Sequence, residues 1–320
     1  MTKTNITNSD AFYDLADQYM KEKRYDEAID LYKKLIEMDS ENDSLLFSLA
    51  WAYRDSGRPA EAMKYFEQLL EKELGRKVFT GFAFDEMVRI YRDEGNYDGL
   101  VDLCERAVVS QPEDVALLDT LGNSCLQAGK TERALEVFEL LTRMEPDSSM
   151  FFCYLGNACI AAGNFGGAEE AYERAIEIEP TEAHTFYNRL GNAYLQVRQY
   201  DRAEDALRKS LDYQSDQPLH YCNLGDILVK QGKLDEAQEA YENAIRINPQ
   251  SRGAYYNRLG HTLAQDHHHS MAIEMYEKAI DADPKNPFYY IALIDLFNSE
   301  GLTEKAEEVY EKARFLKLIS

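Results

Sequence analysis

Hydrophobic and small residues recur along the chain with the spacing of amphipathic helices. The first stripe in the stretch 149–182 consists of Phe152, Leu155, Gly156 and Cys159. Their i, i+3, i+4, i+7 spacing places them on one face of a helix. A second stripe consists of Phe165, Ala168, Tyr172 and Ala175. Gly163 stands between the stripes and favours a left-handed turn, so the stretch predicts two helices joined by a tight turn.

This helix–turn–helix pattern repeats about every 34 residues. Leu-Gly pairs begin at 121, 155, 190, 224 and 259. We number each unit from position 1 to 34 and count nine units, at 9–42, 43–76, 81–114, 115–148, 149–182, 184–217, 218–251, 253–286 and 287–320. A leader at 1–8 and inserts at 77–80, 183 and 252 complete the chain. A repeat of this length indicates stacked helical hairpins, and we expect one array over residues 9–320. The insert at 77–80 is expected to change the local curvature near residues 72–82.

Small residues occupy two fixed positions in most units. Gly is common at position 8, and Ala at position 20, which allows the two helices of a unit to approach closely. Gly at position 15 ends the first helix in six units, and Pro at position 32 ends the second helix in five.

These residues resemble the tetratricopeptide repeat over positions 9–320. The resemblance implies an all-α solenoid that forms a right-handed superhelix, with the first helices lining a concave groove. The chain departs from the pattern at Leu100 and Cys104 in the third unit and at Ile294 in the ninth.

Composition narrows the function. The formal net charge is −23, which disfavours binding to nucleic acid or anionic membranes. No apolar run reaches the ~18–20 residues needed to span a bilayer, and five cysteines without a C-x-x-C spacing favour a reducing, cytoplasmic location. We expect no enzyme activity, no cofactor and no metal site. The "DHHHS" stretch at 266–270 is interpreted as a polar turn, because consecutive histidines rarely converge on one ion.

Candidate binding residues lie at the first-helix positions that the resemblance directs into the groove, which are positions 2, 5, 6, 9, 12 and 13. Units 6 to 8 carry an Asn/Arg set there: Asn188, Arg189, Asn192, Asn223, Asn257, Arg258 and His261. Side-chain amides suit the backbone of an extended peptide, and guanidinium groups suit carboxylates. Units 1 and 3 carry an acidic set instead: Asp10, Asp14, Asp17, Asp85 and Glu86. Trp51 is a candidate aromatic anchor, or it packs against Phe47.

Three of the Asn/Arg residues also resemble the carboxylate clamp of some tetratricopeptide domains: Asn192, Asn223 and Arg258. The two lysine positions of that clamp are occupied here by Asn188 and Ala254. We therefore expect a scaffold or adaptor whose partner is another protein, held by an extended peptide or an acidic C-terminal segment. The bland alternative is that these polar residues only face water.

A second alternative is an assembly protein that forms homo-oligomers through the C-terminal helix. The hydrophobic residues there are Phe315, Leu316, Leu318 and Ile319. They either contact a partner surface or pack back onto the last unit.

Overall fold

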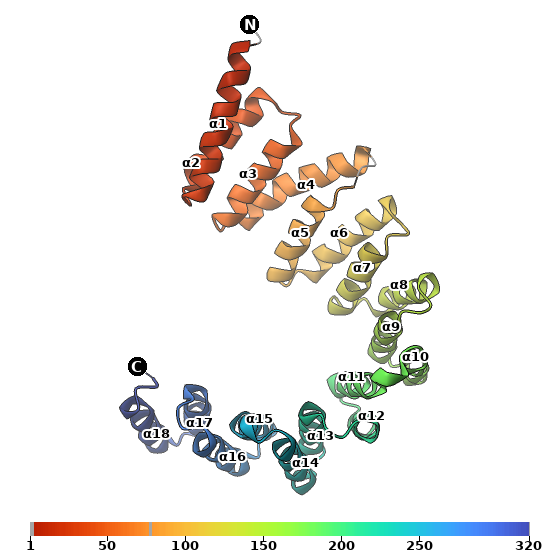
Figure 1. The fold of residues 1–320 in the computed structure, drawn as a ribbon, viewed down its shortest axis with the longest axis vertical. Coiled ribbons are helices and arrows are strands. Elements are labelled where there is room, and N and C mark those ends of the chain that lie inside the picture. Colours follow the sequence, from red (N-terminus) through yellow and green to blue (C-terminus); the bar gives the residue numbers. More distant parts are fainter. Residues whose placement is uncertain (1–2, 77–78, 320) are drawn as a thin grey trace. The chain divides into compact units, whose positions relative to one another are not determined.

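The computed structural model describes residues 3–76 and 79–319, with side chains from Ser9 onward apart from Asp10. The side chains of the predicted leader 1–8, and residues 77–78 of the predicted insert, lie outside the described residues. Within these ranges the elements are α-helices and two short 3-10 helices, without a strand (Figure 1). The all-α helical repeat fold is thereby confirmed.

The chain divides into two compact units, Met1–Met144 and Glu145–Ser320. The helices of the first unit are α1 (Lys3–Lys21), α2 (Tyr25–Met38), α3 (Asp43–Asp55), α4 (Pro59–Arg76), α5 (Phe82–Asp93), α6 (Tyr97–Ser110), α7 (Val115–Gln127) and α8 (Thr131–Met144). Each odd-numbered helix packs against the even-numbered helix that follows it.

The second unit repeats this arrangement. Its helices are α9 (Ser149–Ala161), α10 (Phe165–Ile178), η1 (Pro180–Glu182), α11 (Ala183–Gln196), α12 (Tyr200–Tyr213), α13 (Pro218–Lys230), α14 (Leu234–Ile247), η2 (Pro249–Ser251), α15 (Arg252–Gln265), α16 (His269–Ala282), α17 (Pro287–Ser299) and α18 (Thr303–Phe315). The odd-numbered helices α9 to α17 also contact one another in succession. Their shared side, at positions 2, 5, 6, 9, 12 and 13, is called the first-helix face below.

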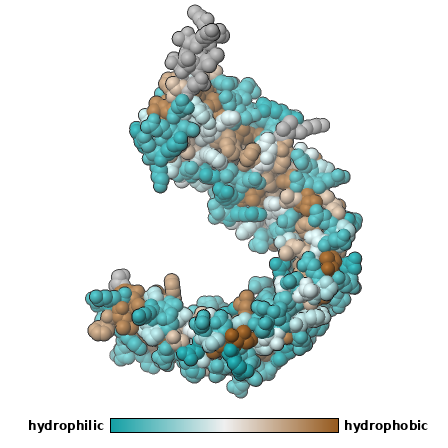
Figure 2. Space-filling view, in the orientation of Figure 1, coloured by the Kyte–Doolittle hydropathy of each residue, from teal (hydrophilic) through white to brown (hydrophobic). Residues whose placement is uncertain are grey.

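Hydrophilic residues cover most of the visible face of each unit, with hydrophobic patches between them (Figure 2). Most side chains at the predicted stripe positions lie in the core, although Phe152, Leu155 and Phe165 are half-buried, and Ala at position 20 is buried wherever it occurs. Gly at position 8 makes room for the large side chain at position 24 of the partner helix. A Cβ atom on Gly156 would lie 2.6 Å from Cδ2 of Tyr172. The close packing of helix pairs therefore depends on this glycine.

All nine turns between paired helices place position 15 in the left-handed region. Gly is found there in six units, with φ between 65° at Gly95 and 76° at Gly57. Lys23, Arg198 and His267 adopt the same conformation, with φ of 59°, 59° and 63°. The "DHHHS" stretch thus includes the turn between α15 and α16, as the sequence predicted.

Helix α4 is longer than its counterparts, with 18 residues against 14 in α2 and α6. The extra turn precedes the insert, and Gly81, with φ 83°, leads into α5. The side chain of Thr80 donates to Glu73, and the rings of Phe79 and Phe84 lie 5.6 Å apart. These contacts hold the end of the insert against the helices on both sides.

Candidate functional site

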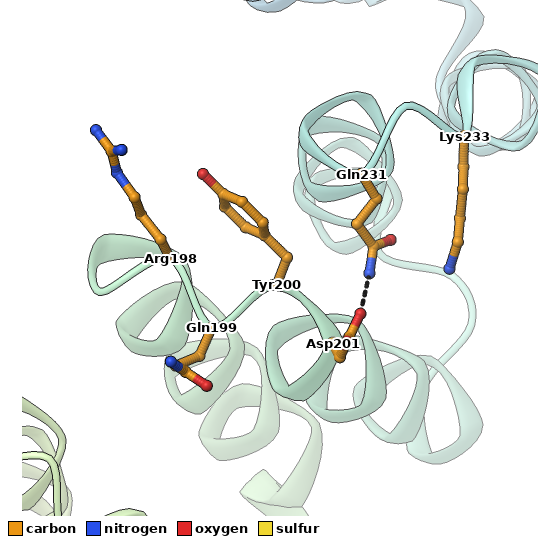
Figure 3. A pocket seen from close by; sticks show the side chains of 6 residues that line it. All are labelled: Arg198, Gln199, Tyr200, Asp201, Gln231 and Lys233. Carbon is orange, nitrogen blue, oxygen red and sulfur yellow. Dashed lines mark hydrogen bonds between the residues drawn. The ribbon is translucent and has the colours of Figure 1, made fainter.

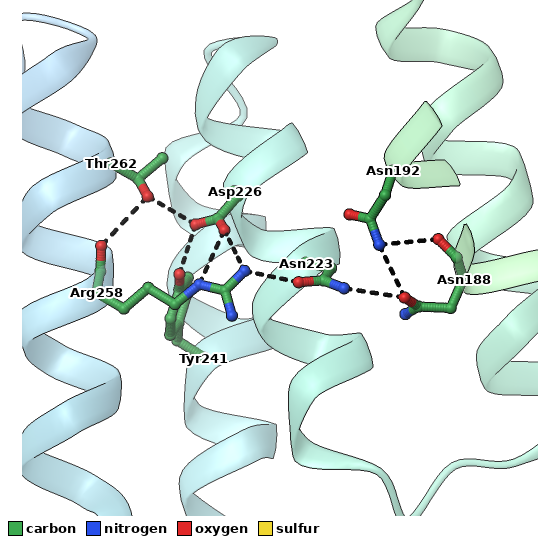
Figure 4. A network of polar contacts seen from close by, with 7 residues as sticks. All are labelled: Asn188, Asn192, Asn223, Asp226, Tyr241, Arg258 and Thr262. Carbon is green, nitrogen blue, oxygen red and sulfur yellow. Dashed lines mark hydrogen bonds and ion pairs between the residues drawn. The ribbon is translucent and has the colours of Figure 1, made fainter. Parts of the chain in front are cut away.

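A buried row of asparagines connects the first-helix faces of α11 and α13 (Figure 4). Asn188 and Asn223 are 8% and 7% exposed. Asn223 Nδ2 donates to Asn188 Oδ1 over 3.1 Å, and Asn192 Nδ2 donates to the same oxygen over 2.8 Å. The buried Nδ2 of Asn188 has no hydrogen-bond partner in the described part of the chain. An unpartnered buried donor costs about 1–3 kcal/mol, so this amide is the most conspicuous polar feature of the face.

The row continues to an ion pair between α13 and α15. Arg258 Nη2 donates to Asn223 Oδ1 over 2.6 Å and to Asp226 Oδ2 over 2.6 Å, and Arg258 Nε lies 3.0 Å from the same carboxylate oxygen. Tyr241 and Thr262 donate their hydroxyl protons to Asp226 Oδ1 over 2.5 and 2.7 Å. Asp226 therefore compensates the charge of Arg258 and fixes its position.

Tyr241 is a reliable donor in this network. It is fully buried, and burial, followed by the charge of Asp226, raises the pKa of Tyr241 well above its ordinary value. The hydroxyl stays protonated at neutral pH as a result. We call the seven connected residues the polar row: Asn188, Asn192, Asn223, Asp226, Tyr241, Arg258 and Thr262.

The structure brings four of the predicted site residues together and leaves the others apart. Asn188, Asn192, Asn223 and Arg258 belong to the polar row. Arg189 is exposed, and its Nη1 lies 2.9 Å from the Met150 sulfur. Asn257 is half-buried with an unpartnered Oδ1, and the exposed His261 contacts Gln265. Of the two arginines among these residues, Arg258 is paired with Asp226, and Arg189 is the exposed one.

Trp51 lies in the first compact unit, Met1–Met144, within an aromatic cluster. Its ring centroid is 4.9 Å from that of Phe47, and the Arg54 guanidinium lies 5.4 Å from the Trp51 ring. Phe47 also lies 6.1 Å from Phe82, which is 67% exposed. Trp51 thus packs against Phe47 and remains 41% exposed, and its role as a binding anchor stays a prediction.

Sequence reasoning missed Asp226, which organises the row. The sequence feature that could have identified Asp226 is a polar residue at position 9 of the first helix combined with a tyrosine at position 24 of the second. The same hydrogen bond joins Tyr32 to Asp17 over 2.9 Å and Tyr172 to Asn157 over 2.7 Å. Positions 9 and 24 therefore need to be read together.

A polar recess of about 350 Å³ lies elsewhere in the second unit, between two inter-helix turns (Figure 3). Its lining consists of Arg198, Gln199, Tyr200, Asp201, Gln231 and Lys233. Gln231 donates to Asp201 over 3.0 Å, and Lys233 pairs with Glu204 over 2.7 Å. Three of its six lining residues, Asp201, Gln231 and Lys233, are therefore already engaged in polar pairs.

Among the described side chains, which begin at Ser9 and leave out Asp10 and residues 77–78, no three His, Cys, Asp or Glu gather closely enough to hold a metal ion. Over residues 3–76 and 79–319 no helix has the length and apolar character required to cross a membrane.

Phe315 and Leu316, two of the predicted C-terminal contacts, are 86% and 44% exposed. Leu318 and Ile319 are half-buried. The four residues therefore divide between packing and exposure.

Sequence models of the tetratricopeptide repeat match residues 19–77, 83–116, 120–183, 181–247 and 216–285, and a PPR repeat matches 288–315. The chain belongs to the tetratricopeptide repeat family, as its helical hairpins and 34-residue period predict. This family supports a protein–protein interaction scaffold.

Among curated proteins the chain is similar to "Small glutamine-rich tetratricopeptide repeat-containing protein 2" of Mycosarcoma maydis, with 33% identity over 30% of this chain and 27% of that protein. It is also similar to "Protein CTR9 homolog" of Arabidopsis thaliana, with 24% identity over 91% of this chain and 27% of that protein. The chain spans about a quarter or less of the length of the first curated relatives that it matches.

Among solved structures, MamA has 24% identity and a TM-score of 0.38 over 52% of this chain and 89% of that one.

Proposed function

We propose that the first-helix face of α11, α13 and α15 binds an extended segment of another protein. The observation that supports this most directly is the unpartnered Nδ2 of Asn188, which is buried at the edge of an otherwise satisfied network. An extended peptide presents a carbonyl oxygen at every residue, and such an oxygen can accept from this donor once the Asn188 side chain turns toward the face, because Nδ2 is shielded from solvent in the unbound chain. Binding would then relieve the cost of the unpaired amide.

The charges on this face favour a role for Arg189 in recognition. Arg258 is engaged by Asp226, so an incoming carboxylate would have to compete with a partner already in place. In the described residues no carboxylate pairs with Arg189. An acidic side chain or a C-terminal carboxylate of the bound segment would therefore meet Arg189 first, through the charge-assisted bonds that guanidinium groups form.

The test is affinity capture from native lysate followed by mass spectrometry. The bait is the full chain, compared with the variant Asn188→Ala/Arg189→Ala. The matched control is Asn123→Ala, because Asn123 lies at position 9 of the fourth repeat, 115–148, and donates to Asp119 on its own helix. We expect partners that wild type and the control both capture and that the double variant fails to capture. Identical partner lists for all three baits would contradict the assignment.

Self-association is the alternative, favoured by the exposed Phe315 and Leu316 on and after α18. Static light scattering over a concentration series distinguishes it. A molar mass that rises with concentration in wild type, and stays monomeric in Phe315→Ser/Leu316→Ser, would support self-association. A constant monomeric mass would exclude it over that range.

A further inference from the structure

An apolar cleft of about 730 Å³ opens between α15, α16 and α17. Its hydrophobic lining includes Tyr276, Phe288, Ile291 and Leu296. Phe288 is 71% exposed and Ile291 is 41% exposed, so two large apolar side chains face solvent at the mouth. Aromatic and aliphatic groups left exposed beside a concavity are typical of sites that bind other proteins.

The backbone around Phe288 is fixed before any ligand arrives. Asn286 caps α17, and its Oδ1 accepts a hydrogen bond from the Phe288 backbone N–H over 3.1 Å. Pro287 occupies the first turn of the helix, where its restricted φ suits the helical conformation. An anchor on a rigid helix start loses little conformational entropy on binding, which favours affinity.

The cleft lies beside the polar row. His261 forms part of its wall, and it stands three residues from Arg258 on α15. Residues three apart on a helix are surface neighbours, with Cβ atoms ~5–6 Å apart. Phe288 and Ile291 occupy positions 2 and 5 of their unit, which belong to the first-helix face. A segment that follows the polar row across α15 therefore reaches the cleft next.

The charges of the lining indicate the chemistry of the occupant. The lining contains the carboxylates of Asp295 and Glu300 and the imidazoles of His261, His267 and His269, but neither Lys nor Arg. His269 pairs with Glu300 on the rim. With a formal charge of −23 on the chain as a whole, the local and overall fields both attract cations.

We propose that this cleft holds one aliphatic or aromatic side chain of a partner segment that carries Lys or Arg within a few residues of that anchor. The proposal rests on the proposed function, because it extends the same binding face from α15 to α17. It assigns that segment a side-chain pocket and a charge that the polar row alone does not specify. The apolar side chain enters between Phe288 and Ile291, and the cationic neighbour lies against Asp295, because Glu300 already contacts His269.

The experiment is a selection of phage-displayed random dodecapeptides on the full chain, followed by fluorescence anisotropy with the enriched peptides. Four further proteins are titrated: Ile291→Asp, Phe288→Ala, Asn188→Ala/Arg189→Ala, and Ile247→Asp as the matched control. Ile247 is 38% exposed on α14, close to the 41% of Ile291, but it lies away from the cleft. Circular dichroism verifies that every variant is folded, and Phe288→Ala removes only an exposed side chain.

Enriched peptides are expected to share a hydrophobic residue next to Lys or Arg. Their Kd should rise about tenfold to a hundredfold with Ile291→Asp and Phe288→Ala, as expected for the loss of one buried apolar side chain, and stay unchanged with Ile247→Asp. Selection of peptides without Lys or Arg near the hydrophobic residue, absence of enrichment, or equal affinity for wild type and Ile291→Asp would overturn the proposal.

The variants separate this proposal from the proposed function. Peptides that respond only to Asn188→Ala/Arg189→Ala would retain the proposed function and remove the cleft from it. Peptides that respond to neither site would contradict both. A wild-type dimer by light scattering that becomes a monomer in Ile291→Asp would identify a second copy of the chain as the occupant and would also overturn the proposal.

Discussion

Replacing Asp226 by alanine should destabilise the second compact unit, Glu145–Ser320. The loss should exceed that of the same change at other position-9 residues that accept a hydrogen bond from a tyrosine. The side chain of Asp226 is 16% exposed and that of Arg258 is 36% exposed. The fully buried Tyr241 would lose its acceptor, which costs about 1–3 kcal/mol. Breaking a fully buried ion pair costs about 3–5 kcal/mol, but the partial exposure of Arg258 lets water replace part of the interaction, so we assign about 1–2 kcal/mol to this loss. The expected total is about 2–5 kcal/mol.

Asp17→Ala is the matched control for this change. Asp17 also stands at position 9 and also accepts a hydrogen bond from a tyrosine at position 24, over 2.9 Å. No arginine pairs with Asp17 among the described residues, so this variant should lose only the single bond and cost about 1–2 kcal/mol. Asp226→Asn retains an acceptor oxygen for Tyr241 and removes the charge, and it should fall between the two.

Urea unfolding followed by far-UV circular dichroism measures the free energies of unfolding. Arg258→Met completes a double-mutant cycle with Asp226→Ala, and a coupling energy of about 1–2 kcal/mol is expected. Hydrogen exchange of the α13 and α15 amides locates the loss within the array. An Asp226→Ala cost no larger than that of Asp17→Ala, together with zero coupling to Arg258→Met, would refute the assignment of Asp226 as the organising residue of the row.

Three further predictions concern pH, backbone strain and thiol reactivity. Burial, and next the neighbouring His184, lowers the pKa of His220 below its ordinary value of 6.5, so the unfolded chain binds more protons and stability should fall as pH drops through about 6.5. Between pH 7 and pH 5 the urea midpoint should therefore fall less steeply in His220→Gln than in wild type, and an unchanged slope would contradict the burial argument. Arg198→Gly should stabilise the chain by about 0.5–1 kcal/mol, because the strain of a non-glycine residue at φ 59° exceeds the extra backbone entropy that glycine loses on folding. The control Arg174→Gly within α10 should instead destabilise the chain by about 1 kcal/mol. All five cysteines are buried, and burial raises the pKa of Cys104 and Cys222 to about 12, so a maleimide at pH 8 should label the native chain slowly and reach five equivalents only in urea.

The period of the sequence was sufficient to predict the helix pairs and their turns. Spacing alone identifies the buried stripe, and Gly163 and Gly156 mark the turn and the close approach. Three turns lack the expected glycine, yet Lys23, Arg198 and His267 adopt the same left-handed conformation. There the two packed helices dictate the backbone of the turn, and local propensity does not decide it.

The candidate site was less predictable, because a helical period identifies the face of a residue and not its partner. Asn188, Asn223 and Arg258 were expected to share a face, and they lie in one row. The burial of Asn188 and Asn223 was not expected, and neither was the engagement of Arg258 by Asp226. Such pairing depends on rotamers across neighbouring helices. Phe288 and Ile291 occupy predicted face positions as well, but the search for polar chemistry passed over them.

The hydrogen bond from position 24 to position 9 has a consequence for engineering. The tyrosine lies on the second helix, but its hydroxyl determines whether the polar residue at position 9 of the first helix is already hydrogen-bonded from behind the face. Leu207 stands at position 24 opposite Asn192, so this amide instead donates within its own helix. Exchanging leucine and tyrosine at position 24 would therefore change the hydrogen bonds of the position-9 residue, and with them its availability to a ligand. No residue on the first-helix face itself would be altered.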